Sequence, residues 1–159
     1  MKNQGSTYTK FDTHKSIEKA NAGLPETMCW SIAGSGFAIV WANSMDRAKL
    51  IRHGLPYESI EVLSIRTKMP IKDILSALEI PQTTYNKNKR EKKVLSGRDS
   101  ELILLLVELL DFGLEVFNQE DEKFQRWLKK PNLSLGGAAP ESLFDSVTGI
   151  QEVKNSLNR

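Results

Sequence analysis

The sequence is poor in the residues on which most secreted and metal-binding domains depend. It contains one cysteine, Cys29, and two histidines among its 159 residues. A single cysteine cannot form an internal disulfide, and no apolar stretch of signal-peptide type follows Met1, so secretion has no support and the cytoplasm is the expected compartment. One cysteine and two distant histidines also lack the spacing of a zinc site. The sequence therefore predicts no metal and no cofactor.

Long hydrophobic runs and catalytic groupings are missing as well. The longest apolar stretch, Leu102 to Leu110, is interrupted by Glu108 and falls far short of the roughly 20 residues that span a membrane. Cys29 has no base near it in the sequence, so no nucleophile and base pair is indicated. Gly136-Gly137 lacks the preceding strand and the following lysine of a phosphate loop. These absences disfavour both a membrane protein and an enzyme.

The overall composition is that of a globular protein. Hydrophobic residues make up 40% and charged residues 26% of the chain, and its length suits one compact body or two small domains that share a core. We expect a flexible N-terminal arm (1–36), a DNA-binding and dimerisation region (37–98) and a helical binding domain (99–159). Gly34-Ser35-Gly36 reads as a flexible joint, although the alternation of Trp30 and Ile32 permits a short extended piece.

The positions of proline, glycine and capping residues, which start and end helices, predict an all-α fold. The pattern turns helical from Phe37, and a first helix is capped by Asn43 or Ser44 and ended by Gly54. Further helices are expected to start at prolines, because proline favours the first helical turn. These are Pro56, Pro70 and Pro81.

The second half of the chain contains three more predicted helices. One is capped by Ser96 and Asp99, runs to about Asn118, and is apolar on nearly every side, so it must be covered by its own domain, by a second copy, or by both. The next runs from Asp121 to Lys130. The last is capped by Thr148 with Gln151 and carries an apolar stripe that includes Leu157.

The two short helices that start at Pro70 and Pro81 have a helix-turn-helix outline, and the second is basic. Its amides can pair with adenine, a threonine methyl can touch thymine, and the lysines and arginine can neutralise phosphates. Tyr85 is expected to face inward. The predicted DNA-binding residues are Gln82, Thr83, Thr84, Asn86, Lys87, Lys89, Arg90, Lys92 and Lys93.

Charge is segregated along the chain, which supports a nucleic-acid partner. The net charge is only +2, but the charges are unevenly distributed. The segment from Lys87 to Lys93 contains five basic residues and one acid, Glu91, whereas the stretch from Glu101 to Glu122 holds seven acids and no lysine or arginine. The alternative is a solvated surface loop. Two departures from the usual helix-turn-helix pattern favour that alternative: Leu75 stands where a small residue is common, and Glu79 replaces the usual turn glycine. Operator binding by single modules is weak, so a homodimer is expected.

The segment after Trp127 concentrates large apolar residues among backbone breakers, as interfaces do. Leu133 and Val147 belong to this set, and Lys154 and Arg159 could meet an acidic rim on a partner. Gly137 and Gly149 would let the chain approach a partner backbone closely. The alternative is that the apolar side chains only close a small core around the long helix.

The same segment, through WL..PN..LGG..P..L and the Thr-Gly that follows, resembles the toxin-binding domain of Xre-type antitoxins. These are the partners of RES-domain toxins and relatives of the MbcA and ParS antitoxins, and looser similarity reaches back to about Met45. The resemblance implies a non-enzymatic antitoxin that neutralises a NAD-degrading RES toxin through this domain and represses its own operon. The predicted toxin-binding residues are Trp127, Pro131, Asn132, Leu135, Gly136, Gly137, Pro140, Leu143, Phe144, Thr148, Gly149, Val153, Lys154, Leu157 and Arg159.

Two other functions stay open at this stage. A stand-alone helix-turn-helix regulator would use the C-terminal part for a ligand or for dimerisation. A ParS-like antitoxin would inhibit a toxin that ADP-ribosylates proteins, and the shared C-terminal pattern does not separate it from an inhibitor of a NAD-degrading toxin. The partners expected from the resemblance are the toxin, operator DNA and a second copy within a hetero-oligomer, with no membrane.

Overall fold

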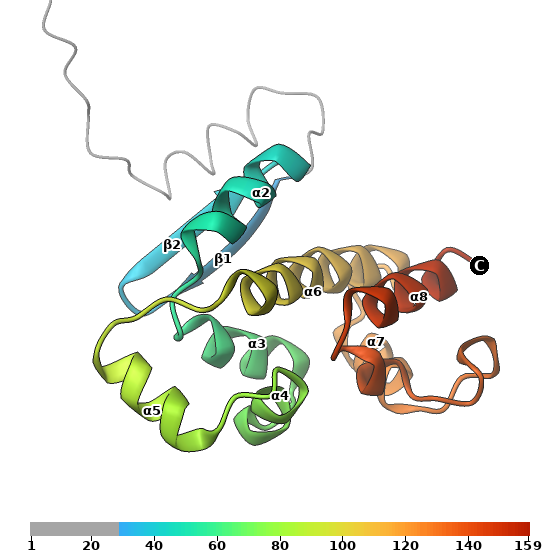
Figure 1. Ribbon diagram of the computed structural model, residues 1–159. Coiled ribbons are helices and arrows are strands. Elements are labelled where there is room, and N and C mark those ends of the chain that lie inside the picture. The colour runs from blue at the N-terminus through green and yellow to red at the C-terminus, as the bar shows by residue number, and fades with distance from the viewer. Residues whose placement is uncertain (1–28) are drawn as a thin grey trace, which may run out of the picture.

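The computed structural model describes residues 29–159, and these form a mostly helical body with one small hairpin (Figure 1). Most of the N-terminal arm expected from the sequence lies outside the described residues. In chain order the elements are β1 (Trp30–Gly34), β2 (Phe37–Trp41), α2 (Ser44–His53), α3 (Ser59–Thr67), α4 (Ile71–Ala77), α5 (Gln82–Arg90), α6 (Gly97–Val116), α7 (Asp121–Lys129), η1 (Leu133–Leu135), η2 (Pro140–Leu143) and α8 (Val147–Leu157).

The hairpin of β1 and β2 corrects two expectations. Within the expected joint at Gly34-Ser35-Gly36, Gly34 ends β1 and the other two residues form the tight turn of an antiparallel pair in which Trp30 lies opposite Trp41. Phe37 begins a strand rather than a helical pattern. Gly36 adopts a φ of 83°, which glycine reaches without steric cost. Ile32 and Trp41 are buried against the helices, because alternate residues of a strand face the same side.

Helix α6 forms the centre of the fold, with α2, α3, α7, α8 and β1 packed around it. Ten of its residues are buried, including Ile103, Leu104 and Val107. Among the carboxylates of α6, Glu108 is the buried one, and it accepts hydrogen bonds from Trp41 Nε1 at 2.8 Å and Arg47 Nη1 at 2.7 Å. The chain's own elements thus bury half of the residues of α6, while Val116 near its end is 42% exposed.

The helix ends follow local capping chemistry, with one shift from expectation. Asn43 Oδ1 accepts from the amide of Asp46, and Ser96 Oγ accepts from that of Asp99, as predicted. The last helix is capped by Ser146, whose Oγ accepts from the Gly149 amide at 3.0 Å, rather than by Thr148. Thr148 instead lies exposed in the first turn of α8.

Helices α4 and α5 are joined by a short turn in which Glu79 is left-handed, with a φ of 57°. This confirms the conformation expected where a glycine is usual, at a cost of about 1 kcal/mol. Leu75, at the position that is commonly small, is buried together with Ile74 and Leu78. Among residues 29–159, no helix combines the length and the apolar character that crossing a membrane demands.

Candidate functional site: a basic helix and a glycine-rich loop

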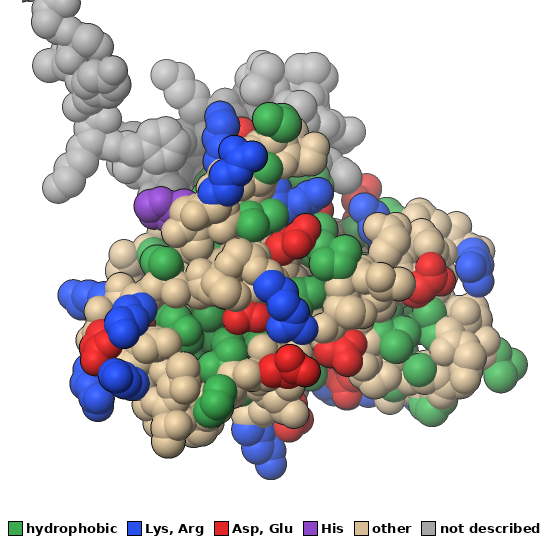
Figure 2. Space-filling view, in the orientation of Figure 1, with side chains coloured by type: hydrophobic (Ala, Val, Ile, Leu, Met, Phe, Trp, Pro, Cys, Tyr) green, Lys and Arg blue, Asp and Glu red, His purple; other side chains and the backbone are tan. Residues whose placement is uncertain are grey.

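Helix α5 lies at one edge of the molecule and presents polar side chains to solvent. Lysine and arginine side chains gather over this helix and the loop after it, at the lower left of Figure 2. Tyr85 is only 4% exposed and packs inward, as the sequence predicts. The other side chains of the predicted DNA-binding face are exposed, namely Gln82, Thr83, Thr84, Asn86, Lys87 and Arg90.

The two amides on this face are hydrogen-bonded to each other. Gln82 Nε2 donates to Asn86 Oδ1 at 3.2 Å, across one helical turn. This orientation leaves Asn86 Nδ2 as a donor and Gln82 Oε1 as an acceptor. Adenine presents the complementary pair in the major groove, an N7 acceptor and an N6 donor. The arrangement is therefore suited to reading a base edge.

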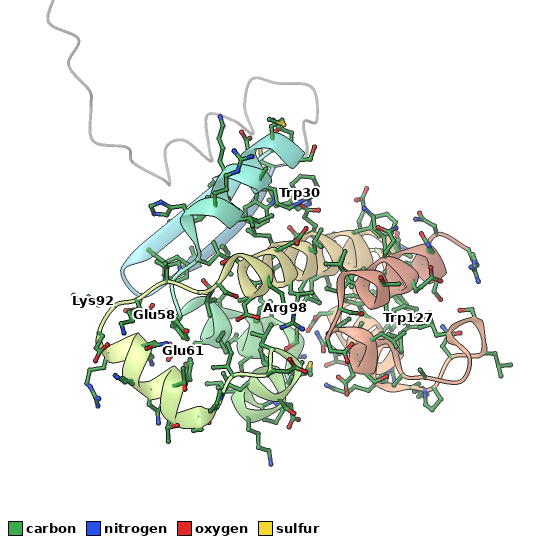
Figure 3. All side chains as sticks on the ribbon, viewed as in Figure 1. Trp30, Glu58, Glu61, Lys92, Arg98 and Trp127 are labelled. Atoms are coloured by element: carbon green, nitrogen blue, oxygen red, sulfur yellow. The ribbon has the colours of Figure 1, made fainter. Side chains whose placement is uncertain are left out.

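Lys89 does not share the outward orientation of its neighbours. It forms an ion pair with Glu61 on α3, and its Nζ lies 5.8 Å from the centre of the Tyr85 ring. Tyr85 Oη donates to the same Glu61 carboxylate at 3.2 Å, and Figure 3 shows Glu61 between α3 and α5. Lys89 thus helps to hold α5 on α3, and its phosphate contact stays a prediction because the ion pair with Glu61 is partly exposed.

The same contacts perturb the tyrosine. Burial, followed by the nearby negative charges of Glu61 and Glu58, raises the pKa of Tyr85 from 10.0 to about 12. A second hydrogen bond joins α5 to the body, since Asn88 Nδ2 donates to Tyr57 Oη at 2.9 Å. The position of the helix is therefore set by residues that sequence reasoning did not single out, Glu61 and Tyr57.

Lys92 and Lys93 lie beyond the end of α5, as predicted, and their backbone is fixed. The Lys93 amide donates to Asn88 O at 2.9 Å, and Lys92 adopts a left-handed φ of 53°. Just beyond, Val94 forms a β-bridge with Pro56, and the Leu95 amide donates to Leu55 O at 2.7 Å. Both side chains therefore extend from ordered backbone at the same edge as α5, and Lys93 Nζ lies 3.0 Å from Glu91 Oε2 in an exposed ion pair.

The second candidate surface is the loop between α7 and η2, which Asn132 closes. The Asn132 amide donates to Ala138 O at 3.0 Å, and Asn132 O accepts from the Gly137 amide at 2.9 Å. Gly136 and Gly137 have φ values of 66° and 85°, which require glycine-like freedom. This spacing of asparagine and glycines therefore makes a compact, internally bonded loop.

The predicted toxin-binding residues divide by exposure. Those at the surface are Pro131, Gly136, Gly137, Thr148 and Arg159, and those that are partly exposed are Trp127, Asn132, Leu135, Leu143 and Lys154. Trp127 packs with Phe117 and Phe124 in an aromatic cluster. The accessible members of the set lie mainly on the loop and on α8, with Trp127 on α7 and Leu143 on η2.

The remaining five predicted residues are buried, which corrects their assignment as direct contacts. They are Pro140, Phe144, Gly149, Val153 and Leu157. At Gly149 a Cβ would come within 2.1 Å of Leu143 O. This glycine therefore serves a close internal approach and not the approach of a partner backbone. The apolar side chains among the five support the surface from below.

Phe144 and Arg98 connect the C-terminal segment with the helix-turn-helix unit. Phe144 is 3% exposed and lines one small cavity with Leu63, Ile74 and Leu78 of α3 and α4. Arg98 donates to Leu78 O and to Asp145 O, each at 3.4 Å, and lies between these parts in Figure 3. The two candidate surfaces therefore stand on one shared core.

Neither candidate surface contains a cluster of side chains that could hold a metal ion. Across residues 29–159, no cluster of three or more histidine, cysteine or acidic side chains could hold a metal ion. Cys29 and His53 are both exposed, and no contact between them is found within that range. The arrangement supports binding of a nucleic acid and of a protein.

Two protein families match the two surfaces. Residues 46–108, which include α5, match the antitoxin Xre-like helix-turn-helix domain. Residues 113–159, which include the glycine-rich loop and α8, match the antitoxin Xre/MbcA/ParS C-terminal toxin-binding domain. The two matches divide the described chain within α6.

Three known proteins align with more than two thirds of the chain. The chain is 26% identical over 110 residues to "Antitoxin Xre" of Photorhabdus laumondii, covering 69% of this chain and 74% of that protein. It is 26% identical over 109 residues to "Antitoxin Xre" of Yersinia enterocolitica, with the same coverage. It is also 28% identical over 128 residues to "Prs ADP-ribosylating antitoxin" of a Sphingobium species, covering 76% of this chain and 80% of that protein.

Proposed function

Because the chain belongs to the Xre/MbcA/ParS antitoxin family, we propose that it is a non-enzymatic antitoxin that binds a RES-type, NAD-degrading toxin through residues after about Asp121 and represses its own operon through α5. The observation that carries the proposal is the pairing, on one core, of an exposed basic helix with an ordered glycine-rich loop. Each of the two lies within the matching domain of this family.

The DNA-binding part rests on the exposed face of α5 and on the loop that follows it. Lys87, Arg90, Lys92 and Lys93 supply positive charge for phosphates, and Gln82 with Asn86 supplies hydrogen-bonding groups for a base edge. The helix is held on α3 by Glu61, so it can enter a groove as a rigid body. Operator palindromes are read by paired modules, so binding as a homodimer is part of the proposal.

The toxin-binding part rests on the C-terminal loop and α8. The loop is closed by backbone hydrogen bonds and carries exposed glycines. A preorganised segment loses little conformational entropy when it binds, which favours tight inhibition. In this proposal the toxin is inhibited because this surface covers its active site.

A second candidate is inhibition of an ADP-ribosylating toxin. The Sphingobium relative carries that activity in its name and aligns over more of this chain than the two Xre relatives do. Both kinds of toxin consume NAD, because ADP-ribosylation transfers the ADP-ribose part of NAD to a protein and releases nicotinamide. The two candidates therefore differ in the product, since ADP-ribosylated protein is expected only with an ADP-ribosylating toxin.

The deciding experiment is co-expression with the toxin of the same operon. Cells that make the toxin alone should stop growing and lose NAD, and cells that also make this protein should grow with normal NAD. Deletion from Pro131 onward is a poor control, because it removes Phe144, Ile150 and Val153 from the core. Point changes on the exposed loop are better controls. Growth arrest in the presence of the folded wild-type protein would refute the inhibitor assignment.

A further inference from the structure

The surface of the C-terminal half carries one large apolar side chain with almost no cover. Leu133 is 95% exposed, more than Ile65 at 78% or any other large hydrophobic residue among 29–159. Hydrophobic atoms protrude at the far right of Figure 2, over the loop between α7 and η2. Isolated exposed apolar residues are common on protein surfaces. Leu133 differs because of the loop that holds it.

The loop around Leu133 is held by side-chain as well as backbone hydrogen bonds. Asn132 Oδ1 accepts from Ser134 N and from Ser134 Oγ, both at 2.9 Å. Ser134 Oγ lies 2.6 Å from Ser156 Oγ on α8, and Asn132 Nδ2 donates to the same Ser156 hydroxyl at 3.4 Å. The residues on both sides of Leu133 are thus tied to α8, so the leucine stands at a fixed place.

The space beside the leucine is open. Nothing lies within 4 Å of where a Cβ would be at Gly136 or Gly137. Of the two leucines in this ordered loop, Leu135 packs against the core, whereas Leu133 is left almost fully exposed. An ordered loop that exposes a leucine beside two glycines, which have no side chains, fits a concave apolar site on another protein.

We propose that Leu133 is the anchor of the toxin interface, inserted into an apolar pocket on the toxin while Gly136 and Gly137 let the rim of that pocket approach the loop backbone. This inference rests on the proposed antitoxin function and names the residue that carries its affinity. Interfaces concentrate their binding energy in a few such buried anchors. The partner is a protein with an apolar pocket. The contribution of Leu133 to affinity should not depend on salt, because neither the leucine side chain nor the lining of the pocket is charged.

The test compares Leu133→Ala with a matched control at another exposed aliphatic residue, Ile65→Ala on α3. Both purified full-length variants should unfold at the temperature of the wild type, since neither side chain is buried. Affinity for the toxin of the same operon is then measured by calorimetry at low and at high salt. Leu133→Ala should weaken binding by about tenfold or more at both salt concentrations, and Ile65→Ala should not.

The possible outcomes separate this inference from the function on which it depends. If the wild-type protein does not bind the toxin, the antitoxin proposal fails. If the wild type binds and Leu133→Ala binds as tightly, or if Ile65→Ala weakens binding equally, the anchor assignment is overturned. A Leu133→Glu variant gives a second reading, because a charge forced into an apolar pocket should abolish binding while leaving the fold intact.

Discussion

Phe144, from the C-terminal segment, lines the same small cavity as Leu78, at the end of α4. The side chains are 66 positions apart in the sequence, yet both are buried. Arg98 reinforces the junction by donating to the Leu78 and Asp145 carbonyls. The two candidate surfaces therefore share one core, and removal of either part would expose buried side chains of the other.

The first prediction tests that junction. Phe144→Ala should lower the free energy of unfolding by about 3–5 kcal/mol, because it leaves a cavity beneath α4. The measurement is urea denaturation followed by circular dichroism. Val147→Ala, at an exposed site three residues away, should stay within about 0.5 kcal/mol of the wild type. Equal effects of the two changes would mean that Phe144 does not support the core.

The sequence predicts the helices well because their signals are local. Asn43, Gly54 and Ser96 cap or end helices through neighbours within four residues. The hairpin is different, because Phe37–Trp41 is an apolar run of five residues whose period does not separate strand from helix. The strand conformation is favoured because Ile32 and Trp41 pack on helices that are distant in the sequence.

The candidate surfaces are predicted less completely, for the same reason. The residue types of α5 and of the glycine-rich loop were enough to predict that both are binding segments. It did not show that Lys89 is paired with Glu61, 28 positions earlier, or that Val153 faces inward. Which member of a motif is exposed depends on long-range packing. Local patterns therefore locate a binding segment but do not resolve its contacts.

The second prediction separates Lys89 from the lysines of the following loop. Lys92→Ala should weaken binding to operator and random DNA alike, and should reduce the salt dependence of log K by about 0.9. Lys89→Ala should leave the salt dependence unchanged, because its charge is paired with Glu61. Fluorescence anisotropy over a series of salt concentrations measures both. A flatter salt dependence for Lys89→Ala would place this lysine on the DNA.

The third prediction concerns alkaline pH. The pKa of Tyr85 is raised from 10.0 to about 12 in the folded protein, chiefly by burial. The unfolded chain therefore releases the proton at lower pH, so the stabilisation is fully present below pH 10 and is lost between about pH 10 and 12. Tyr85→Phe should show a smaller loss of stability across that window. Identical pH profiles of the unfolding midpoint for wild type and variant would contradict the assignment.

The fourth prediction tests whether α8 orders the loop. Ser156→Ala removes the hydroxyl that contacts Ser134 and Asn132. Amide hydrogens of residues 133–137 should exchange faster, and toxin affinity should fall about 3- to 10-fold, because more conformational entropy is lost on binding. Ser76→Ala, at an exposed serine on α4, is the control. Faster exchange with unchanged affinity would show that loop order does not contribute to binding.

The last prediction addresses base reading by α5. Because Gln82 donates to Asn86, the two amides can present one donor and one acceptor to a single adenine. Asn86→Ala should therefore weaken binding to the cognate operator by about 1–3 kcal/mol more than binding to random DNA. Gln82→Ala should reduce the free energy of operator binding less in the Asn86→Ala background than in the wild type, because the joint contact of the two amides with adenine is already lost. Strictly additive losses in this double-mutant cycle would mean that the amides act separately, and equal losses on both DNAs would mean that Asn86 reads no base.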